Sequence, residues 1–477
     1  MGTTVFERRR PAASVIANSL DGTAHAVFWR DDLPAELLPD RAPLTGRHRA
    51  DLVIVGGGYT GLWTALLAQK RAPDARIVVV EAQRVGWAAS GRNGGFCEAS
   101  LTHGHENGMA RWPKEMPLID RLGLENLDAI EAAEAEYGMD FHFERTGQLA
   151  PAVEAHQVEW LKEWAAEGEE GVVYLDEAEA RASVASPTYL AAVWEKNTCG
   201  MVHPARLAAE LARVAEDLGV AIYERSAVTG IETPDRTGVS VVTDAGRVDA
   251  SRAVLATNVF PSLIKRNRLM TVPVYDYVLM TEPLSDEQLA SIGWRDRQGI
   301  GDMANQFHYY RISKDNRILF GGYDAIYHYG RKVRSEYENR PETWEKLAAH
   351  FFTTFPQLEG LKFSHQWAGA IDSSTQFTAF FGTARDRRVA YAAGFTGLGV
   401  GSTRFAGEVM LDLLDGVSNE RTELEMVRRR PLPFPPEPAA AAAVNVVRWS
   451  LDRADHNQGK RNLLLKTLDA LGLGFDS

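Results

Sequence analysis

The sequence predicts two domains: an α/β domain built on a parallel sheet, and a second domain rich in β-strands. Length is the first observation, because 477 residues exceed what a single compact core usually holds. The second is the segment 51–95, where two apolar strands flank a glycine-rich turn and a helical stretch, as in a βαβ unit. The third is a group of strand-like segments between residues 272 and 322, far along the chain from that unit.

The βαβ unit begins with the apolar strand 52–55, which leads into G-x-G-x-x-G at residues 56–61. A helical stretch, 62–69, and a second apolar strand, 77–80, follow, and Glu81 ends that strand. Because strand, turn, helix and acidic residue come in this order, the unit predicts a dinucleotide site. The pattern alone does not separate FAD from NAD.

Each glycine of the turn has a mechanical reason to be there. Gly56 permits the tight turn, Gly58 lets the backbone approach a pyrophosphate, and Gly61 lets the helix pack close to the strand. The helix N-terminus offers free N–H groups and a partial positive charge to the diphosphate. Glu81 is placed to accept hydrogen bonds from a ribose.

Composition and charge exclude several classes of function. The chain is 45% hydrophobic and 24% charged, and its formal charge of −12 argues against non-specific binding to nucleic acid or anionic membranes. Cys97 and Cys199 are its two cysteines, so we expect no disulfide framework and no cysteine-rich metal site. No apolar run approaches the roughly 20 residues of a membrane span, and the run 8–10 of arginines lacks the apolar stretch of an export signal. We expect a cytoplasmic protein.

A second glycine-rich loop, 86–95, follows Glu81. Small residues at this density let a backbone pass close to a flat ligand, and they leave Ser90, Arg92 and Asn93 available to donate to phosphate or ring atoms. Taken alone, the loop could equally be a surface glycine loop.

The segments VIVGGGYTGL and AASGRNGG, with Glu81 between them, resemble the D-amino-acid oxidase superfamily of FAD-dependent amine oxidoreductases. The form SGRNGG most resembles the branch that is like gamma-glutamylputrescine oxidoreductase. The resemblance implies a Rossmann-type FAD-binding domain of the glutathione-reductase kind and a substrate domain with a mainly antiparallel sheet. It also implies that the first loop holds the FAD pyrophosphate, that Glu81 holds the adenosine ribose, and that the second loop runs beside the flavin.

Later segments continue the resemblance. Pro204 begins a helix whose buried stripe is expected at Leu207, Leu211, Val214 and Leu218, with Gly219 as C-terminal cap. The strand 252–258 resembles the one that closes the FAD domain. The glycine-rich segment 394–401 resembles the C-terminal flavin loop, where a helix N-terminus points at the flavin carbonyls. Many relatives have His where Leu398 stands. A cysteine that could bind flavin covalently is absent from this loop, so we expect non-covalent FAD.

The expected FAD-binding residues come from these loops and from single positions that the resemblance supplies. They are Gly56, Gly58, Tyr59, Thr60, Gly61, Glu81, Ala89, Ser90, Gly91, Arg92, Asn93, Gly94, Gly95, Val228, Thr257, Gly369, Gly394, Gly397, Leu398, Gly399 and Val400.

Aromatic residues in the second domain are candidates for the lining of the substrate pocket. The candidates are Tyr275, Tyr277, Phe307, Tyr309 and Trp367, although aromatic residues of strands more often belong to a core. Arg311 could hold a substrate carboxylate, and a structural ion pair is an equally good interpretation. The run 103–106, His-Gly-His-Glu, is expected to be a loop near the flavin, because side chains so close in sequence rarely converge on one metal ion.

The resemblance implies oxidation of an amine, either a polyamine derivative or a secondary or primary amine, to an imine by hydride transfer to flavin N5, followed by hydrolysis, with O2 as acceptor and H2O2 as product. Four alternatives are compatible with the sequence. They are a dehydrogenase with another electron acceptor, an amino-acid oxidase of the glycine, sarcosine or D-amino-acid type, an NAD(P)-linked enzyme, and a flavoprotein subunit that needs a partner. No catalytic base is assigned, and the oligomeric state is left open.

The expected domain boundaries follow the motifs. Residues 1–50 form an N-terminal arm that packs Phe28 and Trp29 onto the body. The FAD-binding domain comprises residues 51–139, 199–264 and 366–427, and the substrate domain comprises 140–198 and 265–365. Residues 428–477 form a proline-rich connector and a C-terminal helical tail.

Overall fold

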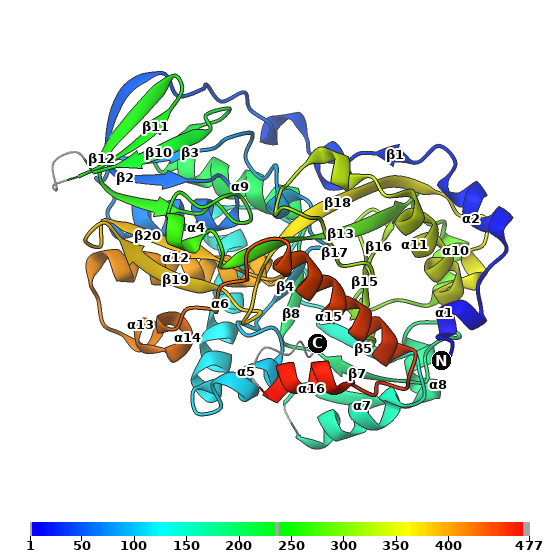
Figure 1. Ribbon diagram of the computed structural model, residues 1–477. Helices are drawn as coiled ribbons and strands as arrows, with labels where there is room; N and C mark the ends of the chain where they lie inside the picture. The colour runs from blue at the N-terminus through cyan, green and yellow to red at the C-terminus, as the bar shows by residue number, and fades with distance from the viewer. Residues whose placement is uncertain (1, 169, 234–237, 471–477) are drawn as a thin grey trace.

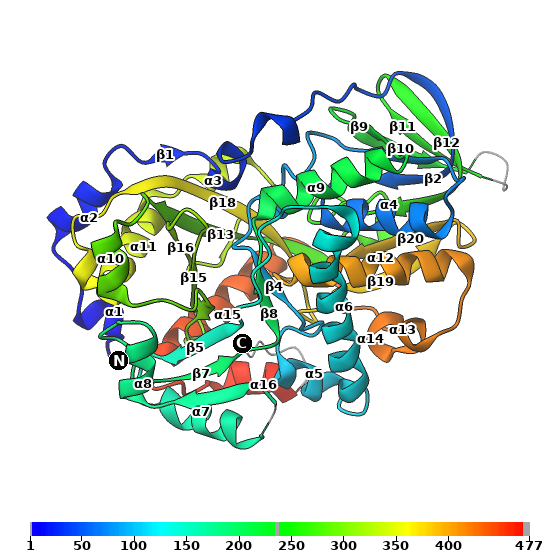
Figure 2. The same ribbon diagram turned by 180° about the vertical axis from the view of Figure 1, so that it is seen from behind.

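A computed structural model describes residues 2–168, 170–233 and 238–470 of the chain. Two large β-sheets, one of eight strands and one of ten, form the two lobes of the molecule (Figures 1 and 2). This mixed architecture confirms the predicted fold class. Over the described ranges, no helix combines the length and the apolar character needed to cross a membrane.

The eight-stranded sheet has a parallel centre, in which β9, β3, β2 and β12 are neighbours and β20 pairs with the end of β12. Strands β10, β11 and β19 extend it with antiparallel pairs. The strands are β2 (Gly46–Val55), β3 (Ile77–Val80), β9 (Ala221–Tyr223), β10 (Val228–Glu232), β11 (Val239–Thr243), β12 (Gly246–Leu255), β19 (Phe380–Ala384) and β20 (Val389–Ala393).

Strand β2 is apolar along its last four residues because both of its faces are covered. Leu52 and Ile54 belong to the core formed with the helices, whereas Val53 and Val55 belong to a second core on the opposite face of the sheet. The helices of this lobe are α4 (Tyr59–Arg71), α5 (His105–Arg111), α6 (Met116–Tyr137), α9 (Pro204–Asp217), α12 (Gly399–Asp415), α13 (Glu420–Glu423) and α14 (Glu425–Arg428).

Helix α9 begins at Pro204, as predicted, and the side chain of His203 caps it by accepting a hydrogen bond from the Arg206 N–H at 3.1 Å. The expected stripe is buried as far as Val214 but is wrong at its last member, because Leu218 is 41% exposed. Leu218 lies past the last helical residue, and Gly219, at φ +99°, turns the chain into β9.

The ten-stranded sheet is mainly antiparallel, with the order β1-β18-β13-β16-β15-β14-β5-β7-β6 and with β17 paired to β13. Its two parallel pairs are β1 with β18 and β14 with β5. The strands are β1 (Ala24–His25), β5 (Gln148–Ala152), β6 (Val172–Leu175), β7 (Ala191–Glu195), β13 (Thr271–Thr281), β14 (Gly299–Gly301), β15 (His308–Ile312), β16 (Ile318–Gly322), β17 (Ile326–Tyr327) and β18 (Phe363–Ser374). The expected boundary at residue 366 falls inside β18, which pairs with β13 as far as Ser374.

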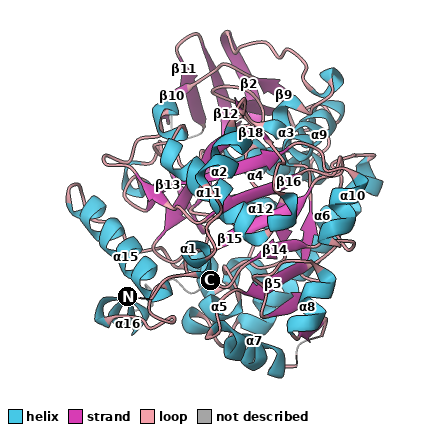
Figure 3. Ribbon diagram, turned by 90° about the vertical axis from the view of Figure 1, so that its right-hand side faces the viewer, coloured by secondary structure: helices cyan, strands magenta, loops and turns pink. Residues whose placement is uncertain are grey.

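Helices flank this sheet, as Figure 3 shows for α10 and α11. They are α7 (Gln157–Ala166), α8 (Glu177–Ser183), α10 (Asp286–Ile292) and α11 (Pro341–Thr354). A small antiparallel pair, β4 (Phe96–Glu98) and β8 (Cys199–Met201), connects the lobes.

The N-terminal arm contains α1 (Val5–Arg8), α2 (Ala13–Leu20) and α3 (Phe28–Asp31), and it runs along the ten-stranded lobe in the blue part of Figure 1. Phe28 and Trp29 are buried against residues of β13 and β18, as predicted. At the other end of the chain, α15 (Ala439–Asp455) crosses the front of Figure 1, and α16 (Leu463–Ala470) lies below it.

Candidate cofactor and substrate site

A cavity of about 1970 Å³ lies between the two lobes. Its wall contains residues of both glycine-rich loops, of the segment 394–401, of β13 and of the C-terminal tail. Pockets for one small molecule usually measure roughly 300–1,000 Å³. The cavity therefore has room for a large cofactor together with a substrate.

The first glycine-rich loop places the N-terminus of α4 at the cavity. Gly56 adopts φ +114°, and a Cβ atom there would lie 2.4 Å from the carbonyl oxygen of Ala256. Gly61 packs so closely that its Cβ would lie 1.9 Å from the carbonyl oxygen of Gly56. Gly58 and Thr60 line the cavity beside the first N–H groups of the helix, which have no partner within it. This is the arrangement in which helix N-termini hold diphosphates.

Glu81 is held in one orientation at the end of β3. One carboxylate oxygen accepts the Gly57 N–H at 2.6 Å, and the other accepts the Gln83 N–H at 2.8 Å. Burial raises the pKa of this carboxyl, while the two backbone hydrogen bonds act in the opposite direction. Glu81 lines the cavity next to the first loop.

The second glycine-rich loop is stabilised by its own polar side chains. The Ser90 hydroxyl accepts the Tyr59 N–H at 3.0 Å, and the Asn93 side chain binds the backbone of Ala89 and Gly95 at 3.0 and 2.9 Å. Arg92 forms an ion pair with Glu338 at 2.6 Å. The groups that were expected to be available for a ligand thus also fix the shape of the loop, and all three side chains line the cavity.

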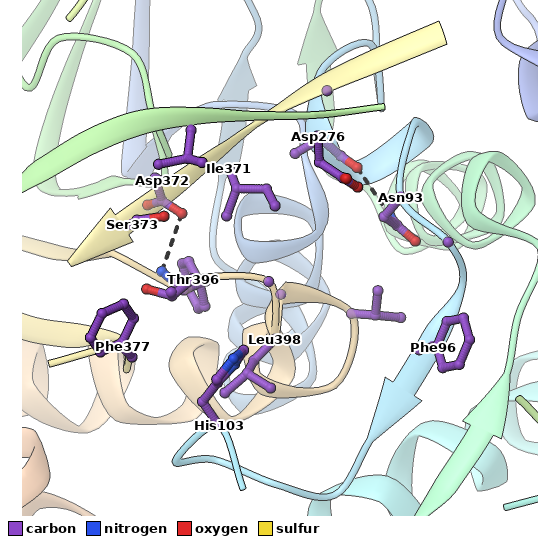
Figure 4. A pocket seen from close by; sticks show the side chains of 18 of the residues that line it. Asn93, Phe96, His103, Asp276, Ile371, Asp372, Ser373, Phe377, Thr396 and Leu398 are labelled. Carbon is purple, nitrogen blue, oxygen red and sulfur yellow. Dashed lines mark hydrogen bonds between the residues drawn. The ribbon is translucent and has the colours of Figure 1, made fainter. Parts of the chain in front are cut away.

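The loop before α12 brings a second helix N-terminus to the cavity, as Figure 4 shows around Thr396 and Leu398. Asp372, at the end of β18, holds this loop by accepting the N–H groups of Gly394 and Phe395. Burial raises the pKa of Asp372 to about 7. The hydroxyl of Thr403, near the start of α12, is buried at the cavity without a hydrogen-bond partner among the described residues.

Most of the expected FAD-binding residues line this one cavity. Three of them, Gly61, Gly91 and Gly394, lie behind its wall. Their positions explain why: a Cβ at Gly91 would lie 2.2 Å from the Gly86 carbonyl oxygen, and one at Gly394 would lie 2.9 Å from Ser374. These glycines allow loops to pack, whereas the cavity-facing ones are Gly56, Gly58, Gly94, Gly95, Gly369, Gly397 and Gly399. The lining also includes Tyr59, Thr60, Glu81, Ala89, Ser90, Arg92, Asn93, Val228, Thr257, Leu398 and Val400.

Strand β13 presents the opposite face to the one expected from its tyrosines. Tyr275 and Tyr277 point into the core of the ten-stranded lobe, where their hydroxyls donate to the backbone carbonyls of Arg334 and Tyr337 at 3.1 and 2.7 Å. The alternate residues Val274 and Asp276 line the cavity. Sequence reasoning missed Asp276, and the signal available for it was a carboxylate within an otherwise apolar strand.

Asp276 and Tyr309 form a half-buried pair against the second loop. The Tyr309 hydroxyl donates a hydrogen bond to the Asp276 carboxylate. The Tyr309 ring lies so close to the second loop that a Cβ at Gly94 would come within 2.7 Å of it. Burial raises the pKa of Asp276 to about 6, and the hydrogen bond from Tyr309 lowers it. Figure 4 shows Asp276 on the same side of the cavity as Asn93.

The remaining pocket candidates separate into two groups. Phe307 and Tyr309 line the cavity. Trp367 and Arg311 do not: the Trp367 indole N–H donates to the Arg92 carbonyl at 2.8 Å, and Arg311 donates to the Val202 carbonyl at 2.6 Å. Both side chains support the second loop and its neighbours from behind. Burial lowers the pKa of Arg311 to about 10.

Acidic side chains outnumber basic ones in the cavity wall. Among the described residues, twelve aspartates and glutamates line it, against four arginines. Such a wall attracts cations and disfavours strongly anionic ligands.

The site fits FAD. Two helix N-termini, glycines that keep the wall free of side chains, a fixed carboxylate at a strand end and an unpartnered buried hydroxyl are suited to a diphosphate, a ribose and a flat ring.

Comparisons with known proteins agree with this geometry. The profile of the DAO family, described as FAD dependent oxidoreductase, matches residues 51–413. Gamma-glutamylputrescine oxidoreductase of Escherichia coli is 32% identical over 376 residues, which cover 77% of this chain and 84% of that protein. A probable oxidoreductase, OrdL, of Haemophilus influenzae is 28% identical, with 78% and 85% covered. Glycine oxidase from Geobacillus kaustophilus has a similar fold, with a TM-score of 0.64 at 22% identity over 78% of this chain and 96% of that one. The chain therefore belongs to the DAO family of FAD-dependent oxidoreductases, as the motifs in its sequence predict.

Proposed function

We propose that the protein oxidises an amine to an imine, which water then hydrolyses to a carbonyl compound and a smaller amine. Bound FAD supplies the acceptor that takes the α-hydrogen as a hydride, and O2 would reoxidise it with release of H2O2. The observation that carries the proposal is the shared cavity, where the FAD-binding loops meet a wall rich in carboxylates. A polyamine derivative is the first choice of substrate, because its ammonium groups match that wall.

Asp276 is proposed to accept the proton of the bound ammonium group. An amine can give up a hydride only in its neutral form, so a group that removes the proton favours reaction. Asp276 lines the cavity next to Tyr309, which packs on the second loop. Because its pKa is near 6, the carboxylate is mostly ionised at neutral pH and can take up a proton.

A simple amino acid is the second choice. The arginine expected to hold its carboxylate, Arg311, is directed at backbone carbonyls behind the cavity wall. A flavoprotein subunit that needs a partner is the third.

Non-covalent binding of FAD is also proposed. The loop 394–401 contains no cysteine. Of the two cysteines in the chain, both are buried, and burial raises the pKa of each thiol, which keeps it from forming the reactive thiolate. Acid precipitation should release all of the flavin into the supernatant.

The test is an anaerobic visible spectrum of the purified protein, titrated with polyamines, acylated polyamines, N-methyl amino acids and simple amino acids. Bleaching of the flavin by one class names that class as substrate. Recovery within the mixing time after exposure to air indicates an oxidase, and slow recovery indicates a dehydrogenase. Colour without bleaching by any compound would contradict the proposal and favour the subunit interpretation.

A further inference from the structure

The C-terminal tail forms part of the cavity wall, although it lies beyond the region matched by the family profile, residues 51–413. Five residues of α15 line the cavity: Ala443, and four at the helical spacing i, i+3, i+4, i+7, which are Val444, Val447, Arg448 and Leu451. The other face carries exposed Trp449 and Val446. The helix is therefore oriented, with Arg448 on its inner side.

Carboxylates at both ends of α15 fix the helix to the ten-stranded lobe. Near its start, Glu437 accepts the Gly330 N–H at 3.1 Å and also the hydroxyl of Tyr327. At its end, Asp455 accepts the backbone N–H groups of Asn305 and Gln306 at 2.9 and 3.0 Å. The position of Arg448 is thus set by contacts on either side of it.

Arg448 differs from the other three arginines of the cavity wall. Arg92, Arg334 and Arg461 each form an ion pair, with Glu338, Glu336 and Asp469 at 2.6, 2.7 and 2.7 Å. Arg448 is half-buried and makes no ion pair or hydrogen bond with any residue that the structure describes. A guanidinium group in this state has five donors and a full charge available to an anion.

We propose that Arg448 binds a carboxylate of the substrate, so that the preferred substrate is an amine that also carries a carboxylate. This inference rests on the proposed amine oxidation and narrows its substrate class. The guanidinium fork matches a carboxylate with two parallel hydrogen bonds. A phosphate fits less well, because its second negative charge would be repelled by the acidic wall.

The test compares two probes that differ only in that charge: gamma-glutamylputrescine, and its analogue with the carboxylate converted to a carboxamide. Binding to the FAD-loaded protein is measured anaerobically by calorimetry, and kcat and KM are measured in air. The variants are Arg448→Gln and, as matched control, Arg453→Gln, which removes the same charge from an exposed position of α15 where Arg453 stacks on Trp449. Arg448→Lys keeps the positive charge but lacks the guanidinium fork, so it tests whether the charge alone is enough to bind the carboxylate.

We expect Arg448→Gln to weaken binding of the carboxylate probe, and to raise its KM, by about 10- to 100-fold, as for loss of a charge-assisted hydrogen bond. The kcat value should change little. The carboxamide should bind the wild type about as weakly as the carboxylate binds Arg448→Gln, and it should not respond to the substitution. Arg453→Gln should behave as wild type with both probes, and Arg448→Lys should recover part of the loss.

Equal effects of Arg448→Gln on both probes, or equal binding of both probes by the wild type, would overturn the inference. Failure of the proposed function has a different signature. If binding depends on Arg448 and on the carboxylate but no amine bleaches the flavin, the amine oxidation is wrong and the anion site stands.

Discussion

At the scale of single residues, the pair of Asp276 and Tyr309 gives the first prediction. If Asp276 accepts the ammonium proton, kcat/KM should rise with pH through about 6, where its carboxyl ionises. Asp276→Asn should lower kcat/KM by roughly 100-fold and abolish this limb of the pH profile. Tyr309→Phe removes a hydrogen bond that favours the carboxylate, so the limb should move to higher pH.

The measurement is kcat/KM between pH 5 and 9 for wild type and both variants, with the flavin spectrum as control for folding and cofactor binding. An Asp276→Asn profile that keeps the wild-type limb would show that another group is titrating.

Glu98, at the end of β4, leads to a prediction on stability. Burial raises the pKa of its carboxyl from 4.5 to about 7, so the fold favours the protonated form. The protonated carboxyl therefore contributes to the free energy of unfolding. This contribution is complete below pH 4.5 and is lost as pH rises through about 7. The FAD-free protein should therefore lose about 2–3 kcal/mol of unfolding free energy from this group between pH 5 and pH 8, and Glu98→Gln should remove that loss.

Thermal midpoints of FAD-free wild type and Glu98→Gln at pH 5 and pH 8 check this prediction. At pH 8 the thermal midpoint of Glu98→Gln should be higher, relative to that of the wild type, than it is at pH 5. An unchanged difference between the two proteins at both pH values would contradict it.

At the scale of elements, the packing of α4 on the first glycine loop predicts the effect of one methyl group. Gly61→Ala would place Cβ 1.9 Å from a backbone oxygen, which cannot rotate away, so helix and strand must separate. Overpacking of this kind costs about 1–3 kcal/mol of unfolding free energy, and the displacement of the helix N-terminus should weaken the binding of FAD.

Gly230→Ala is the control, since the Cβ there would meet open space. Flavin content and thermal midpoint of both variants are the readouts, and a yellow, stable Gly61→Ala protein would refute the packing argument.

Elements also show how far the sequence predicts this molecule. Strand β3 has the predicted limits, and helix α15 lies in the tail that was predicted to be helical, because apolar spacing, glycines and prolines act locally. Which face of β13 meets the cavity was not predictable in this way. One face carries valines and Asp276 and the other carries the tyrosines, so both are largely apolar, and alternation alone does not identify the face that meets the cavity.

At the scale of the whole molecule, the sequence does not reveal which segments far apart along the chain come into contact. Arg311 has the sequence context of a substrate arginine, yet the three-dimensional packing turns it toward the backbone of residues 95 and 202. Conversely, Arg448 lies in a tail with no recognisable motif and reaches the cavity wall only because Glu437 and Asp455 fix α15 across it. Local patterns predict the two glycine-rich loops, since those loops depend on glycine geometry, whereas the composition of the rest of the cavity wall depends on long-range contacts.

The position of the two glycine-rich loops at the cavity between the lobes predicts that bound FAD stabilises the whole protein. A ligand at 100 times its Kd adds about 2.7 kcal/mol to the stability of the native state, which corresponds to roughly 3 °C in Tm for a chain of 477 residues that unfolds as one unit. Gly58→Ala should weaken this effect without harming the fold: Gly58 has φ −89°, which alanine accepts, but its Cβ would enter the cavity 2.8 Å from the Ser90 hydroxyl. Melting curves of FAD-free wild type and Gly58→Ala, recorded against FAD concentration, should start at similar Tm values and then diverge, with the variant needing at least tenfold more FAD for the same shift. Coincident curves would mean that the first loop does not approach the cofactor at Gly58.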